Sequence, residues 1–344
     1  MAELVLYLLL ILVASFVVWK GGSMLESASE TLATHYQLPP VVQGSIITAI
    51  GSSFPELSTT IISTLLHGEF DLGVSAIVGS AIFNILVIPG LSSVIAGKMN
   101  TQWMFVVKDI QFYIISIMGL MLIFGLAVIY NPVAGSDLRG IITRELALIP
   151  IFLYVLYLVL QQEETRAYRR DANNDDHPRS NNIGKVWLRF GVSLILIVGS
   201  VEALVRAVLF LGEYFQTPSF VWGATVLAAA TSVPDAIVSV KGAMNRNGVT
   251  SMANVIGSNI FDLLIAVPAG ILIAGNSIIN FSVASPLMLF LGLSTVLLIM
   301  LLLRSHSLNR SKGTVLLFTY LFFVIWVIME SNGMTSFIGT PASG

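Results

Sequence analysis

The chain carries ten long apolar stretches, and they restrict its fold more than any other feature of the sequence. Of its 344 residues, 56% are hydrophobic and only 10% are charged. A soluble globular protein has about 25% charged residues. Roughly 20 apolar residues form a helix that crosses a bilayer, and in lipid every backbone polar group must find its partner inside such a segment. The sequence therefore predicts an all-α, multi-pass membrane protein.

Hydropathy predicts ten spanning helices in two sets of five. They cover residues 3–20, 38–67, 72–96, 104–129, 141–161, 186–211, 219–245, 250–274, 279–303 and 314–331. Gly, Ser, Thr and Pro interrupt the second, third, seventh and eighth of them, so we expect these four helices to be broken. Because irregular backbone is tolerated at membrane depth only around a polar cavity, the broken helices are expected to form the functional site.

The two sets of helices predict the domain organisation. Residues 1–161 are expected to form a first five-helix repeat and residues 186–344 a second, with residues 162–185 as a hydrophilic linker. The first apolar run has an acidic residue before it and Lys20 after it, the reverse of a cleavable signal peptide, so it is expected to stay as the first helix. The positive-inside rule predicts both termini outside the cell membrane and the linker in the cytoplasm, because nearly all basic residues between helices then face the cytoplasm.

Two pairs of motifs repeat between the halves. Residues 51–56 read Gly-Ser-Ser-Phe-Pro-Glu, and residues 79–84 read Gly-Ser-Ala-Ile-Phe-Asn. Residues 230–235 read Ala-Thr-Ser-Val-Pro-Asp, and residues 257–262 read Gly-Ser-Asn-Ile-Phe-Asp. The two proline-containing motifs correspond at an offset of 179 residues, and the two Gly-Ser motifs correspond at an offset of 178. Because each half has an odd number of helices, the copies must lie in opposite orientations, which predicts an inverted repeat of the kind found in many transporters.

A proline stands directly before a carboxylate in each half, as Pro55 before Glu56 and Pro234 before Asp235. Proline offers no N–H to the carbonyl four residues back, so we expect a free carbonyl close to each carboxylate. A carboxylate inside a membrane is costly and normally handles ions or protons. We therefore expect these two carboxylates, together with Asp262, to bind a cation.

The candidate ligands are all oxygen atoms, from carboxylates, a carboxamide, hydroxyls and backbone carbonyls. Hard cations such as Ca²⁺ and Na⁺ prefer this set, whereas zinc and copper call for His or Cys. The chain has no cysteine, which excludes disulfides and thiolate metal sites, and its net charge of −2 gives no basis for nucleic-acid binding. We expect no bound cofactor. The expected partners are Ca²⁺, Na⁺ and the lipid bilayer, and the chain is expected to act as a monomer.

At these motifs the chain resembles the α-repeats of the cation/Ca²⁺ antiporter superfamily, in particular its prokaryotic-type Na⁺/Ca²⁺ exchangers. The family pattern Gly-(Thr/Ser)-Ser-x-Pro-(Glu/Asp), followed by Gly-Ser-x-x-Phe-(Asn/Asp), is recognised in both halves, and the ten-helix layout matches along essentially the whole chain. The resemblance implies secondary active exchange of Ca²⁺ for Na⁺ by alternating access. It also implies electrogenic extrusion of Ca²⁺ at three Na⁺ per Ca²⁺.

The resemblance also implies a role for each candidate ligand. Glu56 and Asp235 resemble the central Ca²⁺-coordinating pair, supported by Ser52 and Thr231, and Asn84 and Asp262 resemble a midplane pair. The flanking Na⁺ ligands are the hydroxyls of Ser53, Ser80, Ser232 and Ser258 and the carbonyls of Ala49 and Ala228. Two positions depart from many prokaryotic members, which have Glu in place of Asp235 and Thr in place of Ser52.

Other interpretations stay open at this point. A proton-coupled cation exchanger would use the same carboxylates, although its relatives usually carry Gly-Asn followed by Glu in the repeat. An intramembrane aspartyl protease would pair Asp235 with Asp262, but this leaves Glu56 unexplained and the chain lacks the Gly-x-Gly-Asp motif at these positions. A channel or a purely structural membrane protein is a further alternative.

Two other pairs of charged residues lie near the predicted spans. Glu202 and Arg206 are spaced by four on the sixth helix, which predicts a structural ion pair. Glu26 and Glu30 are expected in the loop before the second helix and have no partner in the sequence. Lining an access path for cations is one role that stays open for them.

Overall fold

A computed structural model describes residues 1–36, 49–100, 103–136, 138–169, 182–245, 248–303 and 307–335 of the chain. Half of the predicted linker, the predicted beginning of the second helix and the end of the chain lie outside these residues. The described residues are almost entirely helical, which confirms an all-helical membrane protein. Eight helices are long and apolar enough to cross a membrane, or nine if one bent pair counts as a single span.

The helices of the first half are α1 (Ala2–His35), α2 (Ala49–His67), α3 (Phe70–Ala96), α4 (Trp103–Tyr130) and α5 (Arg144–Arg169). The second half begins with α6 (Ile183–Phe215) and continues with α7 (Ser219–Trp222), the π-helical turn η2 (Gly223–Leu227), α8 (Ala228–Thr231) and α9 (Val233–Met244). It ends with α10 (Gly248–Phe261), the π-helical turn η3 (Asp262–Ala266), α11 (Val267–Ala274), α12 (Phe281–Leu303) and α13 (Arg310–Ser331).

The predicted break is confirmed for the seventh helix and wrong for the second and the third. α2 runs without interruption through the first motif, with Pro55 inside the helix. The seventh span bends by 49° at Ser232, one residue after α8 ends. In contrast, α3 runs without interruption through Gly79 and Ser80. Its motif contains no proline, so every motif residue keeps an N–H for the helical ladder. The predicted eighth helix is likewise not interrupted, and contains instead the wider π-helical turn that begins at Asp262.

The first helix is longer than predicted, and it carries Glu26 and Glu30. The prediction that these two acids lie in a loop is therefore wrong. Leu25, Ala28 and Leu32 continue the helical spacing of apolar residues beyond the predicted end, and all three are buried. This burial explains why the helix extends past its charged residues.

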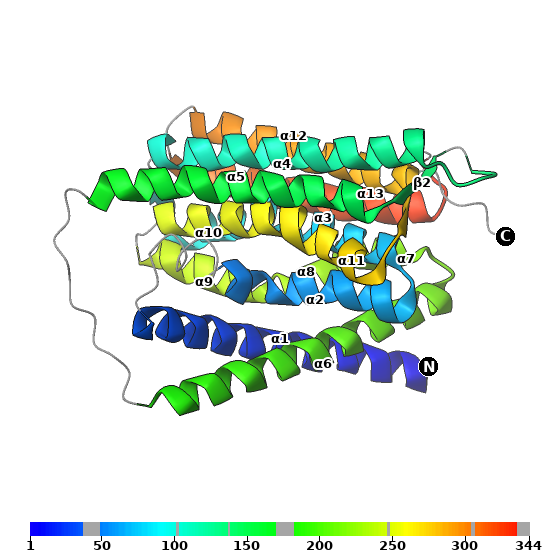
Figure 1. The fold of residues 1–344 in the computed structure, drawn as a ribbon, viewed down its shortest axis with the longest axis horizontal. Helices are drawn as coiled ribbons and strands as arrows, with labels where there is room; N and C mark the ends of the chain where they lie inside the picture. The colour runs from blue at the N-terminus through cyan, green and yellow to red at the C-terminus, as the bar shows by residue number, and fades with distance from the viewer. Residues whose placement is uncertain are drawn as a thin grey trace.

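Two short antiparallel ribbons join the halves, and hydropathy gave no sign of them. β1 (Lys98–Asn100) pairs with β4 (Ser307–Asn309), and β2 (Arg139–Ile142) pairs with β3 (Ser277–Asn280). In each ribbon one strand comes from the first half and the other from the second. The N-terminus, the β2 strand and the end of α13 lie at one end of the bundle, while α5 ends and α6 begins at the other (Figure 1).

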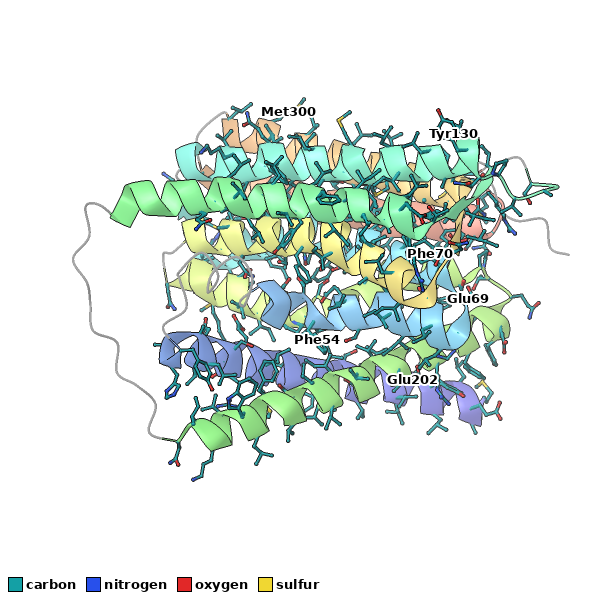
Figure 2. The ribbon with its side chains drawn as sticks, in the orientation of Figure 1. Phe54, Glu69, Phe70, Tyr130, Glu202 and Met300 are labelled. Carbon is teal, nitrogen blue, oxygen red and sulfur yellow. The ribbon has the colours of Figure 1, made fainter. Side chains whose placement is uncertain are left out.

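The helices form three groups in space (Figure 1). The long helices α1 and α6 cross each other on one side of the bundle, with Tyr7 of α1 stacked on Phe210 of α6 at 3.9 Å between ring centroids. The motif-bearing elements lie in the middle, and α4, α5, α12 and α13 cover the opposite side. Large apolar side chains such as Met300 and Tyr130 are 62% and 74% exposed (Figure 2), as expected of a surface that faces lipid.

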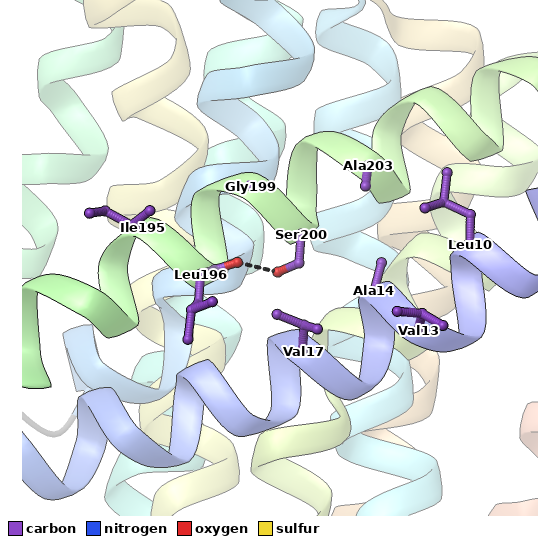
Figure 3. Close-up of a pocket in the computed structure, with 9 residues that line it drawn as sticks. All are labelled: Leu10, Val13, Ala14, Val17, Ile195, Leu196, Gly199, Ser200 and Ala203. Carbon is purple, nitrogen blue, oxygen red and sulfur yellow. Dashed lines mark hydrogen bonds between the residues drawn. The ribbon is translucent and has the colours of Figure 1, made fainter.

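A groove of about 280 Å³ lies between α1 and α6 (Figure 3). Its lining is aliphatic except for Ser200, whose hydroxyl donates to the carbonyl of Leu196 at 2.6 Å. It presents no unsatisfied oxygen atom among these lining residues. The groove therefore has none of the ligands that a cation requires, and the candidate site lies elsewhere.

Candidate cation site

The site depends on a close crossing of the two halves, α3 of the first against η2 of the second. A Cβ atom on Gly79 would overlap the backbone of Ala224, and one on Gly223 would overlap the side chain of Ser75. Glycine is thus required at both positions, because any side chain would push the helices apart. The crossing brings the motif of α3 directly beside the bend at Ser232.

Three carboxylates lie buried in this central region. Glu56 on α2 is 1% exposed, Asp235 on α9 is 2% exposed, and Asp262 at the start of η3 is fully buried. Within the part of the chain that the structure describes, no Lys, Arg or His forms an ion pair with any of them. An uncompensated buried charge is strongly destabilising, so this arrangement calls for a cation from outside the protein.

Seven oxygen atoms around these acids have no hydrogen-bond partner in the described structure. They are Ser53 Oγ, Glu56 Oε2, Asn84 Oδ1 and both carboxylate oxygens of Asp235 and of Asp262. Buried polar atoms in proteins are nearly always paired, and a group of exceptions points to an ion or water that belongs there. The set is entirely oxygen, which is the chemistry that hard cations prefer.

The polar contacts connect the two halves. Ser80 Oγ lies 3.4 Å from Glu56 Oε1 and 2.6 Å from Ser232 Oγ of the other half. Because Ser80 has a single proton, it donates to Glu56 when Ser232 donates to it. Thr231 is also a polar neighbour of Glu56. These contacts place two predicted ligands, Ser80 and Thr231, beside this carboxylate, and Ser232 behind Ser80.

The other two carboxylates have polar neighbours from both halves as well. The polar neighbours of Asp235 are Ser52 and Asn84 from the first half and Asn254 and Ser258 from the second. Asp262 lies near Ser53 and Asp235. The structure therefore brings together all of the predicted side-chain ligands, although it brings no three acidic or histidine side chains of the described residues close enough to hold a metal by themselves. A bound cation must complete its shell with hydroxyls, amides, carbonyls or water.

Some predicted ligands are already engaged within their own helices. Thr231 Oγ1 donates to the carbonyls of Leu227 and Ala228, and Ser258 Oγ donates to the carbonyl of Asn254 at 2.6 Å. Their lone pairs remain, so both hydroxyls still serve as acceptors. The Ala228 carbonyl accepts from Thr231 and from the Ser232 N–H, so this conformation does not present it to a cation. For Ala49 the structure describes only the backbone, as the first residue of α2.

Sequence reasoning missed two asparagines at the site, Asn254 and Asn259. Asn254 donates to Ser239 at 3.4 Å, and Asn259 lies within 3.0 Å of Asn84. Both lie on α10, eight and three residues before Asp262, which begins η3. Helical spacing therefore places them on the same face as this carboxylate. The second motif also departs from the family pattern, since Ala230 occupies the position of the first glycine.

The structure also places the two other pairs of charged residues that the sequence analysis singled out. Glu202 pairs with Arg206 at 2.5 Å, as predicted, and also with His67 of α2 at 3.0 Å, which was not predicted. Glu26 lies against the first motif, since its backbone is 3.3 Å from where a Cβ on Gly51 would stand. Its side chain is only partly buried.

Comparison with known proteins agrees with this geometry. The chain matches the family described as sodium/calcium exchanger protein over residues 6–162 and 185–329. The inner membrane protein YrbG of Escherichia coli (strain K12) is 25% identical over 328 residues, which cover 93% of this chain and 95% of YrbG.

Solved structures share the fold. The H⁺/Ca²⁺ exchanger CAX matches with a TM-score of 0.68 at 15% identity, covering 95% of this chain and 87% of CAX. The sodium–calcium exchanger NCX_Mj matches with a TM-score of 0.62 at 21% identity, covering 94% and 98%. Since the family match extends over most of the chain, the chain belongs to the sodium/calcium exchanger protein family, whose members are multi-pass membrane transporters and not enzymes.

Proposed function

We propose that this chain exchanges Ca²⁺ for Na⁺ across the cell membrane by alternating access. The observation that carries the proposal is the central group of three buried carboxylates with no basic partner among the described residues, surrounded by seven unpaired oxygen atoms. This is a cavity of negative charge built from hard ligands. This set of ligands suits Ca²⁺ and Na⁺. Among the described residues no basic side chain compensates the negative charge, so a bound cation is required.

Exchange follows if both ions use the same ligands. Glu56 and Asp235 supply the charge for Ca²⁺, with Ser52 and Thr231 beside them. The hydroxyls of Ser53, Ser80, Ser232 and Ser258 and the backbone carbonyl of Ala49 complete flanking Na⁺ positions. The Ala228 carbonyl joins them when it gives up its hydrogen bonds from Thr231 and Ser232. Because Glu56 is within reach of both sets, the site holds either ion but never both, and this exclusion couples the two fluxes.

The charge of the site sets the stoichiometry. Glu56, Asp235 and Asp262 carry three negative charges when ionised, and Asn84 carries none. Three Na⁺ neutralise the site, whereas one Ca²⁺ leaves one negative charge. A bare carboxylate at mid-membrane is costly, so Asp262 takes a proton, or sits beside water, in the Ca²⁺ state. With water beside an ionised Asp262, a cycle of three Na⁺ per Ca²⁺ moves net charge and responds to voltage, at about 2.3 kcal/mol per charge per 100 mV. A proton that crossed with Ca²⁺ would make the cycle electroneutral.

Two inverted five-helix repeats give the alternating geometry. The pair of ribbons supports this arrangement. β1 and β3 occupy equivalent places in the two halves, as do β2 and β4, so interchanging the halves turns the β1–β4 ribbon into the β2–β3 ribbon. The crossed helices α1 and α6 contact the centre from one side, with Gly22 of α1 against the ring of Pro234. We propose that this pair slides across the centre to change access, with both termini outside and the linker in the cytoplasm.

Proton coupling is the second candidate. It is favoured by the absence of basic partners among the described residues, since a buried carboxylate without a cation is neutralised equally well by a proton, and by the likeness in fold to an H⁺/Ca²⁺ exchanger. In that case H⁺, and not Na⁺, is the ion that displaces Ca²⁺ from the site.

Equilibrium binding of ⁴⁵Ca²⁺ to the purified protein in detergent distinguishes the two candidates. If Na⁺ and Ca²⁺ share ligands, bound ⁴⁵Ca²⁺ falls steeply as Na⁺ rises at constant pH and ionic strength, and choline has no effect. If H⁺ is the coupling ion, Na⁺ behaves like choline and only lower pH displaces Ca²⁺. Failure to bind ⁴⁵Ca²⁺ under all conditions would remove both.

A further inference from the structure

One acidic side chain beside the site, Glu26 of α1, is not among its proposed ligands. The Cα atom of Glu26 lies 3.3 Å from where a Cβ atom on Gly51 of the first motif would stand. One turn earlier on α1, a Cβ atom on Gly22 would lie 3.1 Å from the ring of Pro234. Residues four apart share one face of a helix. This face of α1 therefore contacts the proline-containing motifs of both halves, and Glu26 stands at that contact.

The surroundings of Glu26 make an unpaired carboxylate costly. Leu25 and Ser29 of α1 are 1% and 4% exposed, and Glu26 itself is half-buried. Within the described residues Glu26 forms no ion pair. Lys20, the lysine of the same helix, lies instead over the ring of Trp19, at 4.4 Å from its centroid. An ionisable side chain held at membrane depth without a basic partner is expected to face a path for ions or water.

Glu26 stands between solvent and the central acids. Its electrostatic neighbours are Glu30 and Asp235. Glu30 lies one turn further along α1 and is exposed, whereas Asp235 is 2% exposed and its carboxylate oxygens have no hydrogen-bond partner in the described structure. The exposure of the three acids thus decreases toward the site. Because neighbouring carboxylates repel each other, a cation between Glu26 and Asp235 would relieve an unfavourable contact.

The internal repeat shows that the other half lacks this acid. At the offset of 179 residues that relates the proline-containing motifs, Glu26 corresponds to Val205 of α6 and Glu30 corresponds to Leu209. Val205 is fully buried and carries no charge. The α1 side of the site therefore has an acid where the α6 side has an aliphatic residue. In an inverted repeat the two sides serve opposite faces of the membrane, so a role of Glu26 in cation passage belongs to one face only.

We propose that Glu26 is a transient cation ligand on the cytoplasmic access path, which receives Ca²⁺ before the ion reaches Asp235. The proposal rests on the proposed function, since it assigns the route to the same site. With the N-terminus outside, Glu26 lies in the cytoplasmic half of α1, and Glu30 follows it toward the cytoplasm. A carboxylate on such a path raises the local concentration of cations at the entrance to the central site.

The test measures half-saturation by Ca²⁺ separately at the two faces of the membrane. Everted vesicles loaded with Na⁺ present the cytoplasmic face to external ⁴⁵Ca²⁺, and right-side-out vesicles present the outer face, with vesicles from cells that lack the protein as the blank. Glu26→Gln should raise half-saturation roughly tenfold at the cytoplasmic face, as for loss of local cation enrichment. At the outer face, beyond the reach of this charge, the change should be less than about twofold. Glu26→Asp keeps the charge and should restore most of the cytoplasmic affinity.

Glu30→Gln is the matched control. It removes the same charge one turn further along α1, at an exposed position that solvent ions screen, so half-saturation should change less than about twofold at either face. Should Glu26→Gln not fold, Glu26→Ala replaces it, because alanine favours the helix.

Three results would overturn the inference while leaving the proposed function intact. They are an unchanged cytoplasmic half-saturation in Glu26→Gln, an equal shift at both faces, as a merely structural role would give, and a shift of the same size in Glu30→Gln. Absence of Na⁺-dependent exchange in the unmodified protein would instead refute the proposed function.

Discussion

Glu56, Asp235 and Asp262 stand out among the residues of this chain because each is almost completely buried and none pairs with a basic side chain in the described structure. Their positions were predictable from the sequence, since proline, hydroxyls and a carboxylate recur together in both halves. The bonds of Asn259 were not, because they depend on which helix of the other half passes Asn84. Hydrogen bonds between distant segments leave no trace in local spacing.

Removal of one central charge should abolish Ca²⁺ exchange. Glu56→Gln and Asp235→Asn each keep the shape of the side chain and lose a full charge. At an effective dielectric of about 20, one charge pair at about 4 Å is worth about 4 kcal/mol, which corresponds to roughly a thousandfold in affinity. Binding of ⁴⁵Ca²⁺ checks this, with elution as a folded monodisperse protein as the control. Near-normal affinity in either variant would place the site elsewhere.

Asp262 should behave differently from the central pair. If Asp262 takes a proton when Ca²⁺ is bound, its replacement removes a titrating group and leaves the central Ca²⁺ ligands Glu56 and Asp235 in place. Asp262→Asn should therefore flatten the pH dependence of exchange while shifting Ca²⁺ affinity less than Asp235→Asn does. Initial rates measured from acidic to alkaline pH test this point. A variant with the unmodified pH profile would show that Asp262 does not titrate during the cycle.

At the scale of helices and strands, the crossing of α3 with η2 holds the site together. Sequence reasoning expected breaks at all four motifs. Within the described residues a break is present at Ser232, two residues before Pro234, whereas Pro55 lies inside an unbroken α2, so proline alone does not decide the outcome. The small residues of the α3 motif serve close packing instead, as at Gly79, which contacts Ala224. Glycine permits both a break and a close approach, so composition alone did not separate these outcomes. The ribbons were missed because strands of three or four residues with distant partners give no periodic signal.

Gly79 and its repeat equivalent Gly257 offer a matched test of this crossing. Gly79→Ala places a methyl group into the backbone of Ala224, whereas nothing lies within 4 Å of a Cβ at Gly257. Overpacking costs about 1–3 kcal/mol, while alanine stabilises an unobstructed helix by roughly 0.5–1 kcal/mol relative to glycine. Thermal unfolding in detergent should show a lower midpoint for Gly79→Ala and an equal or higher one for Gly257→Ala. Equal midpoints would mean that the crossing is looser than the structure indicates.

At the scale of the whole molecule, the arrangement predicts which surface faces which compartment. The connection between α4 and α5 lies at the end of the bundle that holds the N-terminus, and the beginning of α6 lies at the other end (Figure 1). The chain has no native cysteine, so single cysteines can be labelled without background. Ala134→Cys should react with an impermeant maleimide in intact cells, and Asn182→Cys only after permeabilisation. The opposite pattern would invert the proposed topology, and equal labelling would contradict a spanning bundle.

The central claim, that a Na⁺ gradient drives Ca²⁺ through this site, is tested most directly by ⁴⁵Ca²⁺ uptake into proteoliposomes loaded with Na⁺. Uptake should be fast when the external medium contains choline and stop when internal and external Na⁺ are equal. It should persist with no pH gradient, increase when the vesicle interior is made positive, because each cycle carries net positive charge out with Na⁺, and vanish in Glu56→Gln. Uptake that ignores the Na⁺ gradient and follows an imposed pH gradient instead would contradict the account.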